Sequence, residues 1–317
     1  MKAAVVTGAG ETPAYLEFRD PVPSGGAVVV KVTAAALSHV SRSRAAGTHY
    51  SGTEDFPFVA GVDGVGRLAD GQRVYFLVPA APFGGMAEQT LIDASHCVLL
   101  PDDIDDVTAA ALAIPGMSSW AALTERAKFI KGETVMVNGA TGASGRLAVQ
   151  IARHLGAGKI IATGRNREAL KALPALGADV LIPLADDADG LEASFLARFR
   201  EGVDVVLDYL WGASAERLLI AAAKASDAFA TIRFVQIGSA SGGSIALPSA
   251  VLRATDIQLM GSGTGSLPMP RMLHAITALM RAAGPAGLTI ATQPVPLSEV
   301  AAAWTTAGAA RPVFTMG

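Results

Sequence analysis

The sequence contains little cysteine and little charge, and each shortage narrows the possible functions of the chain. Cys97 is the only cysteine among 317 residues, which excludes an intrachain disulfide and a cysteine-rich structural zinc site. Charged residues make up 17% of the chain, and the formal net charge is -3. No cluster of lysine and arginine is present to bind a phosphate backbone, so we expect no nucleic acid partner.

Hydrophobic segments typical of a membrane span are also lacking. Residues 107–124 and 235–252 are uncharged over a sufficient length, but Pro, Gly and Ser interrupt both. We therefore expect buried loops and short elements there, and no membrane partner. The N-terminal segment has no apolar core of signal-peptide length followed by a cleavage site, so we expect a cytoplasmic protein.

The chain changes character along its length. About the first hundred residues hold short β-branched runs separated by glycine and proline, with strands expected at 3–6, 28–32, 73–78 and 86–92. Helical patterns begin near residue 105 and resume at SSWAALTERAKF. Strands and helices then alternate, with strands expected at 134–138, 160–163, 180–182, 203–207 and 231–237. This alternation predicts an α/β fold with a parallel, doubly wound sheet.

One strand–loop–helix unit carries the clearest chemical signal. A short apolar run at 135–137 leads into three glycines spaced G-x-x-G-x-x-G, and an amphipathic helical pattern follows over 147–155. Such glycines let a pyrophosphate approach backbone N–H groups at a helix N-terminus. We predict a nucleotide-phosphate loop, although a purely structural turn would also use glycine. The loop residues expected to contact the cofactor are Gly139, Thr141, Gly142, Ala143, Ser144 and Gly145.

The end of the next strand indicates which dinucleotide is bound. An NAD-binding fold usually has an acidic residue there, which accepts hydrogen bonds from the ribose hydroxyls. This chain has Gly164, Arg165 and Arg167 instead. Since a guanidinium pairs well with a phosphate dianion, we predict NADPH as the cofactor. The alternative is a solvated helix start at which the arginines serve no ligand.

Several sequence blocks, in order along nearly the whole chain, resemble the medium-chain dehydrogenase/reductase superfamily, zinc-free quinone oxidoreductase type. They include DFPFVAGVDGVGRL, GGMAEQTLIDASHCVLLPDDI, VMVNGATGASGRLAVQIARHLGA, GVDVVLDYLWG and FVQIGSASG. The resemblance implies a GroES-like, β-rich catalytic domain at 1–113 and 256–317. It also implies a Rossmann NADPH-binding domain inserted at 114–255.

The resemblance also bears on metal binding. Zinc-dependent relatives have a Cys at the position of Ser38 and a His-Glu pair at the positions of Val62 and Asp63. Serine and valine supply neither a thiolate nor an imidazole, so we expect no metal. His39 is adjacent to Ser38, but the histidines lack ligand spacing, and a hydrogen-bonded structural role is the simpler interpretation.

The family pattern implies candidate active-site residues. Ser38 matches an Asn near the nicotinamide, and Tyr50 lies near an active-site Tyr, although the alignment could shift this position to His49. Either could donate a proton or belong to a surface loop. The pattern also places Ser118, Gly238 and Ser239 beside the cofactor.

We therefore expect an NADPH-dependent, zinc-independent oxidoreductase that transfers a hydride to a quinone or an α,β-unsaturated carbonyl. A 2-enoyl thioester reductase on the same fold is one alternative, and an NADPH-binding regulatory protein without turnover is another. The resemblance further implies a homodimer and a small-molecule partner.

Overall fold

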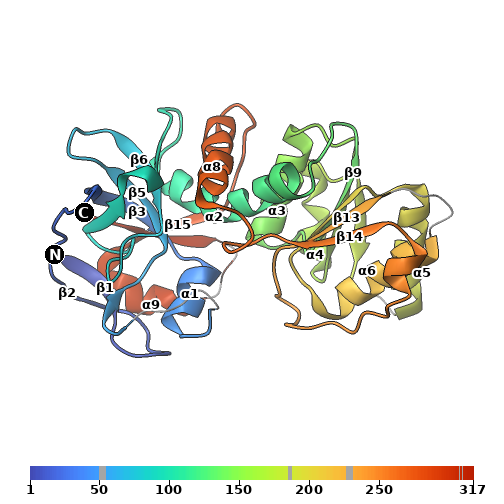
Figure 1. Ribbon diagram of the computed structural model, residues 1–317, viewed down its shortest axis with the longest axis horizontal. Coiled ribbons are helices and arrows are strands. Elements are labelled where there is room, and N and C mark those ends of the chain that lie inside the picture. Colours follow the sequence, from blue (N-terminus) through green and yellow to red (C-terminus); the bar gives the residue numbers. More distant parts are fainter. Residues whose placement is uncertain (50–54, 185–187, 226–230, 307, 309) are drawn as a thin grey trace. The chain divides into compact units, whose positions relative to one another are not determined.

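The structure is a computed structural model that describes residues 1–49, 55–184, 188–225, 231–306, 308 and 310–317. The chain divides into two compact units. Unit 1 comprises Met1–Ile114 and Ile276–Gly317, and unit 2 comprises Pro115–Ala275. The predicted fold class is confirmed, because unit 2 contains a doubly wound parallel sheet and unit 1 is rich in antiparallel strands (Figure 1).

The strands of unit 1 form two sheets, and their pairings are antiparallel except for the parallel pair β15 and β16. One has the strand order β2-β1-β4, and the other has the order β15-β16-β3-β5-β6-β8, with β7 also paired to β3. The elements are β1 (Lys2–Val6), β2 (Ala14–Glu17), β3 (Ala27–Ala36), α1 (His39–Ala45), β4 (Phe58–Val59), β5 (Asp63–Arg67), β6 (Arg73–Leu77), β7 (Gln89–Asp93), the 3-10 turn η1 (Ala94–His96), β8 (Cys97–Leu99), β15 (Thr292–Pro296), the 3-10 turn η4 (Leu297–Glu299), α9 (Val300–Trp304) and β16 (Arg311–Thr315).

In unit 2 the parallel sheet has the strand order β11-β10-β9-β12-β13-β14. The elements are the π-helical turn η2 (Ala122–Arg126), β9 (Thr134–Asn138), α3 (Ala143–His154), β10 (Lys159–Gly164), α4 (Arg167–Lys171), the 3-10 turn η3 (Pro174–Leu176), β11 (Val180–Pro183), α5 (Ala188–Glu201), β12 (Val205–Asp208), α6 (Gly212–Ala225), β13 (Ile232–Gln236), α7 (Val251–Ala254) and β14 (Ile257–Gly261). Helices α2 (Asp106–Ala121) and α8 (Met269–Ala283) each contain a boundary between the units.

Apolar side chains at alternate strand positions point to opposite faces of the parallel sheet, and both faces are buried. Met136, Ile161, Val206 and Phe234 pack in one core cluster with Phe195 of α5 and with the apolar face of α6. The intervening positions of β9 and β10 are also buried, and α3 packs against these two strands. The chain leaves β9 for β10 on one side and returns to β12 on the other, so the order of connection reverses between β9 and β12. Ligands of such sheets bind at the carboxyl ends of the strands at this reversal.

Besides residues 235–252, which were expected to be buried but are largely exposed over 239–250, three expectations from the sequence need correction. Residues 107–124 form no loop: α2 runs through Pro115, and η2 follows it without a break. A proline removes one backbone donor, but the turns on both sides of Pro115 are buried, and packing stabilises the helix despite the loss. Helix Asp106–Arg126 is long and apolar enough to cross a membrane, but protein buries 72% of its most apolar window, as in a core helix.

The second correction concerns the end of the inserted unit. We placed the return to the first domain at residue 256, but β14 pairs in parallel with β13, from Ile232 with Ile257 to Gln236 with Gly261. The parallel sheet therefore extends past residue 256, and unit 1 resumes at Ile276. The third correction is at the strand expected over 73–78. It ends at Leu77 because Val78 has a φ of +60°, which no strand residue adopts.

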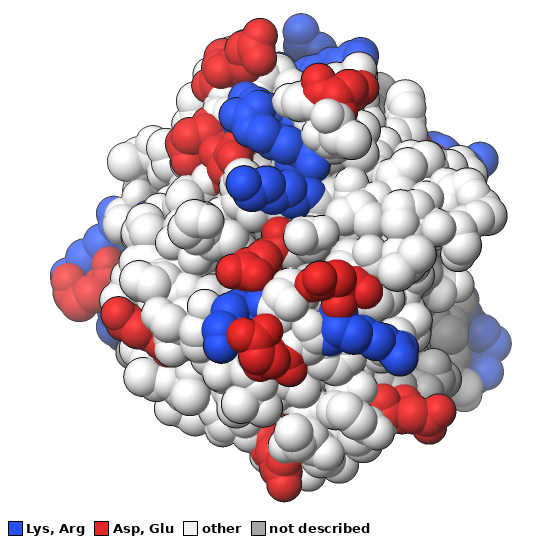
Figure 2. Space-filling model, turned by 90° about the vertical axis from the view of Figure 1, so that its left-hand side faces the viewer, with Lys and Arg blue, Asp and Glu red and all other residues white. Residues whose placement is uncertain are grey.

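Charge on unit 1 is mixed. Figure 2 shows one face of the molecule, where basic and acidic side chains are interspersed and most of the surface is uncharged. Ion pairs within unit 1 include Lys2 with Glu17 and Arg73 with Asp106.

Candidate functional site

The glycine loop connects β9 to α3 as predicted, and its glycines differ in what they do. Gly139 has a φ of +92°, which disfavours any side chain. At Gly145 a Cβ atom would lie 2.3 Å from the carbonyl oxygen of Gly139, so this glycine is needed for close packing of α3 on the loop. A Cβ atom at Gly142 would meet nothing within 4 Å. The fold therefore requires Gly139 and Gly145, whereas nothing in the folded chain requires a glycine at Gly142.

The N-terminus of α3 presents backbone donors to solvent. Gly142 is the N-cap residue, and no side chain caps the helix there. The first intrahelical bond runs from Arg146 N to Gly142 O, so the N–H groups of Ala143, Ser144 and Gly145 precede it. Gly142 and Ala143 are exposed. Backbone donors and the helix dipole together favour an anionic group at this position.

The end of β10 lies next to this loop. Gly164 is buried, and a Cβ there would lie 2.5 Å from the methyl group of Thr141. Asn166 caps α4, since its side chain accepts from Ala169 N. Arg165 and Arg167 are exposed on either side of this cap. The acidic residue nearest to them in sequence, Glu168, pairs with Lys171 at 2.8 Å. The Glu168 carboxylate is therefore paired with Lys171, and it does not take the place of the acidic residue that binds ribose in an NAD site.

A buried polar network joins the ends of β9, β10 and β12. The Asn138 amide donates to Asp208 at 2.8 Å, and the Thr163 hydroxyl donates to the Asn138 oxygen at 2.7 Å. Thr163 in turn accepts from Gly139 N at 3.2 Å. All three side chains are fully buried. The network fixes the start of the glycine loop relative to its neighbouring strands. Asn138 and Thr163 were not among the site residues predicted from the sequence.

Asp208 also organises the turn after β12. Its carboxylate accepts from Leu210 N at 3.0 Å and from Trp211 N at 3.1 Å, and its carbonyl accepts from the N–H groups of Ile237 and Gly238. Burial raises the pKa of Asp208, and these donors oppose the rise. The turn needs such anchoring because Trp211 has a φ of +55°, a costly conformation for an aromatic residue.

The residues expected beside the nicotinamide lie near this turn. Ser118 on α2 donates to the carbonyl oxygen of Pro115 at 2.7 Å. Gly238 follows β13, and a Cβ there would lie 2.8 Å from the carbonyl oxygen of Tyr209. Ser239 is exposed. Burial raises the pKa of Tyr209, and hydrogen bonds that include one to Ser118 oppose the rise. Ser118 and Gly238 therefore have a common neighbour in Tyr209.

In unit 1, Ser38 is a structural cap as well as a candidate active-site residue. It is the N-cap of α1: its hydroxyl accepts from Ser41 N at 3.0 Å and shares a 2.9 Å hydrogen bond with the Ser41 hydroxyl. Tyr50 lies outside the described residues. His49 is partly buried, and burial, aided by the charge of Arg44, lowers its pKa.

The positions of the zinc ligands in zinc-dependent relatives hold a different arrangement. Val62 is buried, and Asp63 is fully buried with one oxygen accepting from the Tyr75 hydroxyl at 3.1 Å. The other oxygen has no partner. Burial raises the pKa of Asp63 to about 7, partly offset by the charge of Arg311. Among the described residues, no three His, Cys, Asp or Glu side chains are grouped to hold a metal ion.

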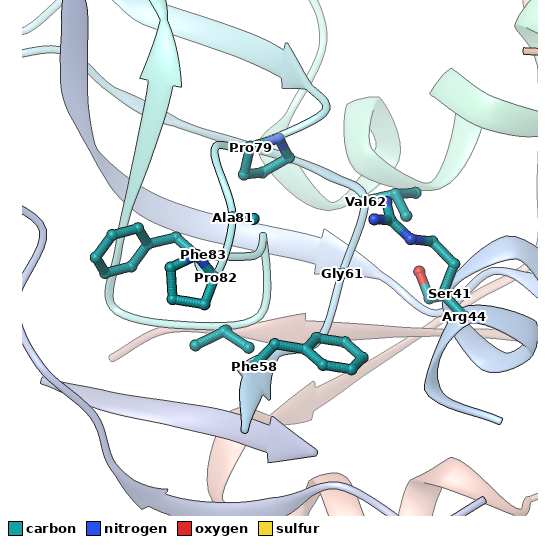
Figure 3. A pocket seen from close by; sticks show the side chains of 10 residues that line it. Ser41, Arg44, Phe58, Gly61, Val62, Pro79, Ala81, Pro82 and Phe83 are labelled. Atoms are coloured by element: carbon teal, nitrogen blue, oxygen red, sulfur yellow. The ribbon is translucent and has the colours of Figure 1, made fainter. Parts of the chain in front are cut away.

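A recess of about 390 Å³, counting its open mouth, lies in unit 1 beside these residues (Figure 3). Most of its lining side chains are apolar, Ser41 and Arg44 of α1 supply its polar side chains, and polar atoms, backbone included, make up more than half of its exposed surface. Figure 3 shows the Arg44 side chain extending toward Val62. The remaining lining residues are Phe58, Val59, Gly61, Pro79, Ala81, Pro82 and Phe83. Since Ser41 bonds to Ser38, the recess adjoins the candidate active-site serine.

Comparisons with known proteins agree with this architecture. Residues 143–280 match the family model described as zinc-binding dehydrogenase. The chain is 29% identical to a probable NADPH-dependent quinone reductase of Emericella nidulans, over 96% of each chain. It is 32% identical to a chloroplastic NADPH-dependent alkenal/one oxidoreductase of Arabidopsis thaliana, over 49% of this chain and 44% of that one. The solved quinone oxidoreductase of Thermus thermophilus, described also in complex with NADPH, has a TM-score of 0.82 and 26% identity, with both chains fully covered.

Proposed function

The chain belongs to the medium-chain dehydrogenase/reductase superfamily, in its quinone oxidoreductase branch, and we propose that it is an NADPH-dependent reductase of quinones and α,β-unsaturated carbonyls. The observation that carries this proposal is the glycine loop with the uncapped α3 behind it and Arg165 beside it. The names of its relatives support both the cofactor and the class of acceptor.

The residues of unit 2 fit a phosphorylated dinucleotide. The N–H groups of Ala143, Ser144 and Gly145 would hold the pyrophosphate, because a helix N-terminus without a side-chain cap leaves them free for an anion. Arg165 and Arg167 would pair with the 2′-phosphate, because a guanidinium favours a dianion over a neutral hydroxyl. Ser118, Gly238 and Ser239 would lie at the nicotinamide end.

The bound dihydronicotinamide supplies the hydride for the reaction. The protein must orient the acceptor, exclude water and deliver one proton to the reduced oxygen or carbon. We assign hydrogen bonding to the acceptor to Ser38, whose hydroxyl accepts from Ser41 N and has its proton to donate when the Ser41 hydroxyl is the donor of the bond between the two side chains. Tyr50, or His49 in its place, is the second proposed donor. The lowered pKa of His49 would favour the neutral imidazole at pH 7.

We place the acceptor at the mouth of the recess in unit 1. Phe58, Phe83 and two prolines supply apolar side chains there, and Ser41 and Arg44 of α1 supply polar ones. A quinone or a short enone has an apolar body with a carbonyl at its edge, so it makes use of both kinds of group.

We further propose that the reaction is independent of zinc. Ser38 and Val62 stand where zinc-dependent relatives have a thiolate and an imidazole, and neither side chain is a zinc ligand of useful strength. A homodimer and a cytoplasmic location remain expectations from the family and the sequence.

Two alanine variants test the cofactor loop. Gly142→Ala adds a methyl group to open space in the folded chain, and alanine is a poorer N-cap than glycine, so we expect its free energy of unfolding to fall by no more than about 1 kcal/mol. The same methyl would lie in the path of the pyrophosphate, so NADPH affinity, measured by fluorescence titration, should fall about tenfold or more. Gly145→Ala is the matched control, and it should lower both stability and affinity because its Cβ meets backbone. Unchanged NADPH affinity in Gly142→Ala would refute the proposed loop.

The acceptor is tested by steady-state assays of NADPH oxidation. We expect turnover with 1,2-naphthoquinone, 9,10-phenanthrenequinone or short enones. Turnover confined to a 2-enoyl thioester would replace the proposed acceptor class with thioesters. Tight NADPH binding without oxidation by any acceptor would indicate a regulatory protein instead of an enzyme.

A further inference from the structure

Tyr209 contacts the segments that carry the proposed nicotinamide end of the site. It directly follows β12, and a Cβ on Gly139 would lie 3.4 Å from its own Cβ. A Cβ on Gly238 would meet its carbonyl oxygen at 2.8 Å. Its side chain extends to α2, where its hydroxyl and that of Ser119 share a hydrogen bond of 2.8 Å. One residue thus joins the glycine loop, the end of β13 and the helix that holds Ser118.

The hydroxyl end of Tyr209 lies in a polar cluster with Ser119 and Ser118. Ser119 is fully buried, and both Ser118 and Ser119 also bond to the carbonyl oxygen of Pro115. Burial raises the pKa of Tyr209 to about 12, partly offset by the two serines. The phenol therefore stays protonated at neutral pH and holds its hydrogen bond across the range in which the enzyme would work.

The backbone beneath Tyr209 is rigidly anchored. The Tyr209 N–H donates to the carbonyl oxygen of Asn138 at 3.0 Å, and the Asp208 carboxylate holds the strained turn at Trp211. The Tyr209 carbonyl accepts from Ala240 N at 3.3 Å. A side chain on such a base can hold α2 at a fixed distance from the strand ends.

We propose that Tyr209 is a positioning residue for the nicotinamide end of the cofactor. Its hydrogen bond to Ser119 fixes the turn of α2 that carries Ser118, and so sets the Ser118 hydroxyl relative to Gly238 and the strand ends. This role rests on the proposed function, because it assumes that NADPH binds at the carboxyl end of this sheet. The adenosine end, at Arg165, does not depend on it.

The test compares two ligands in two single variants and their combination. Tyr209→Phe keeps the ring and removes the hydroxyl, and Ser119→Ala removes the partner. The ligands are NADPH and 2′-phospho-ADP-ribose, which has the adenosine end and the pyrophosphate but no nicotinamide. Fluorescence titration gives the Kd of NADPH, and calorimetry gives the Kd of the fragment.

We expect each single variant to raise the Kd of NADPH roughly fivefold, as loss of one hydrogen bond does, and to change the Kd of the fragment less than twofold. The double variant should be no weaker than either single variant, because both lose the same interaction. Tyr75→Phe, which removes a buried phenol hydroxyl in unit 1, is the control and should leave the ratio of the two Kd values unchanged.

Equal weakening of both ligands would overturn the proposal, since it would show that Tyr209 supports only the stability of the unit. Unchanged NADPH affinity, or additive effects in the double variant, would overturn it as well. Wild-type protein is titrated first, and failure of either ligand to bind there would count against the proposed function and not against the role of Tyr209.

Discussion

The buried Asp63 predicts an unusual pH dependence of stability, and Asp63→Asn isolates it. The carboxyl is fully buried with one hydrogen bond, from Tyr75, and burial raises its pKa from 3.8 to about 7 despite the nearby Arg311. Because the folded pKa lies above the unfolded value, the folded state holds this proton more tightly. The stabilising effect of this bound proton is therefore complete below about pH 4 and is lost as pH rises toward 7.

The shift from 3.8 to about 7 corresponds to at most about 4 kcal/mol, since one pKa unit is worth about 1.4 kcal/mol. Most of the pH range between the two pKa values can be measured. Between pH 5 and pH 7.5, the contribution of Asp63 to the free energy of unfolding should fall by roughly 2–3 kcal/mol. Asparagine has nearly the same shape and does not titrate. The unfolding free energy of wild type minus that of Asp63→Asn should therefore fall by this amount between pH 5 and pH 7.5.

The assay is urea denaturation of both proteins at several pH values, because the difference cancels the titration of all other groups. A difference that stays flat would mean that Asp63 is ionised throughout, with Arg311 outweighing burial. A difference that grows with pH would refute the reasoning outright, since it would require a folded pKa below the unfolded one.

Three further predictions follow from the site. Arg165→Asp should raise the KM for NADPH about tenfold or more, through loss of a charge-assisted bond, and leave the KM for NADH unchanged or lower; a rise confined to NADH would contradict the assignment of Arg165. Asp208→Ala should lower the unfolding free energy by about 3 kcal/mol or more in urea denaturation, because the buried donors of Asn138 and Trp211 lose their acceptor, and an effect under about 1 kcal/mol would mean that the turn is held otherwise. Dialysis against a chelator should leave quinone reduction unchanged, and loss of activity together with stoichiometric zinc would disprove zinc independence.

Local patterns were enough to predict much of unit 2 from the sequence. The β9–α3–β10 unit was predicted because apolar runs, spaced glycines and a helical face all agree there. Strand β14 was missed because it is an edge strand with Gln258 and Leu259 exposed, and Gln258 interrupts its short apolar run. Helix α2 was predicted in two pieces because Pro115 is a local stop signal that burial of the surrounding turns overrides.

The polar contacts of the site were harder to predict, since they depend on residues distant in sequence. Asp208 was expected to orient neighbouring loops, and it does so through Trp211. The pairing of Tyr209 with Ser119 spans 90 residues and involves residue types common in any core or helix. No spacing in the sequence marks such a pair, because only the folded chain brings the residue after β12 to α2.

The split of unit 1 along the chain has a consequence for synthesis on the ribosome. Strand β16, Arg311–Thr315, pairs with β3, Ala27–Ala36, so a segment made after the whole of unit 2 completes a sheet begun before it. Unit 2 is continuous and can fold once its own residues have emerged. The earlier strands of unit 1 must wait through that time with an unpaired edge at β3, which makes the nascent chain prone to aggregation until β16 has emerged.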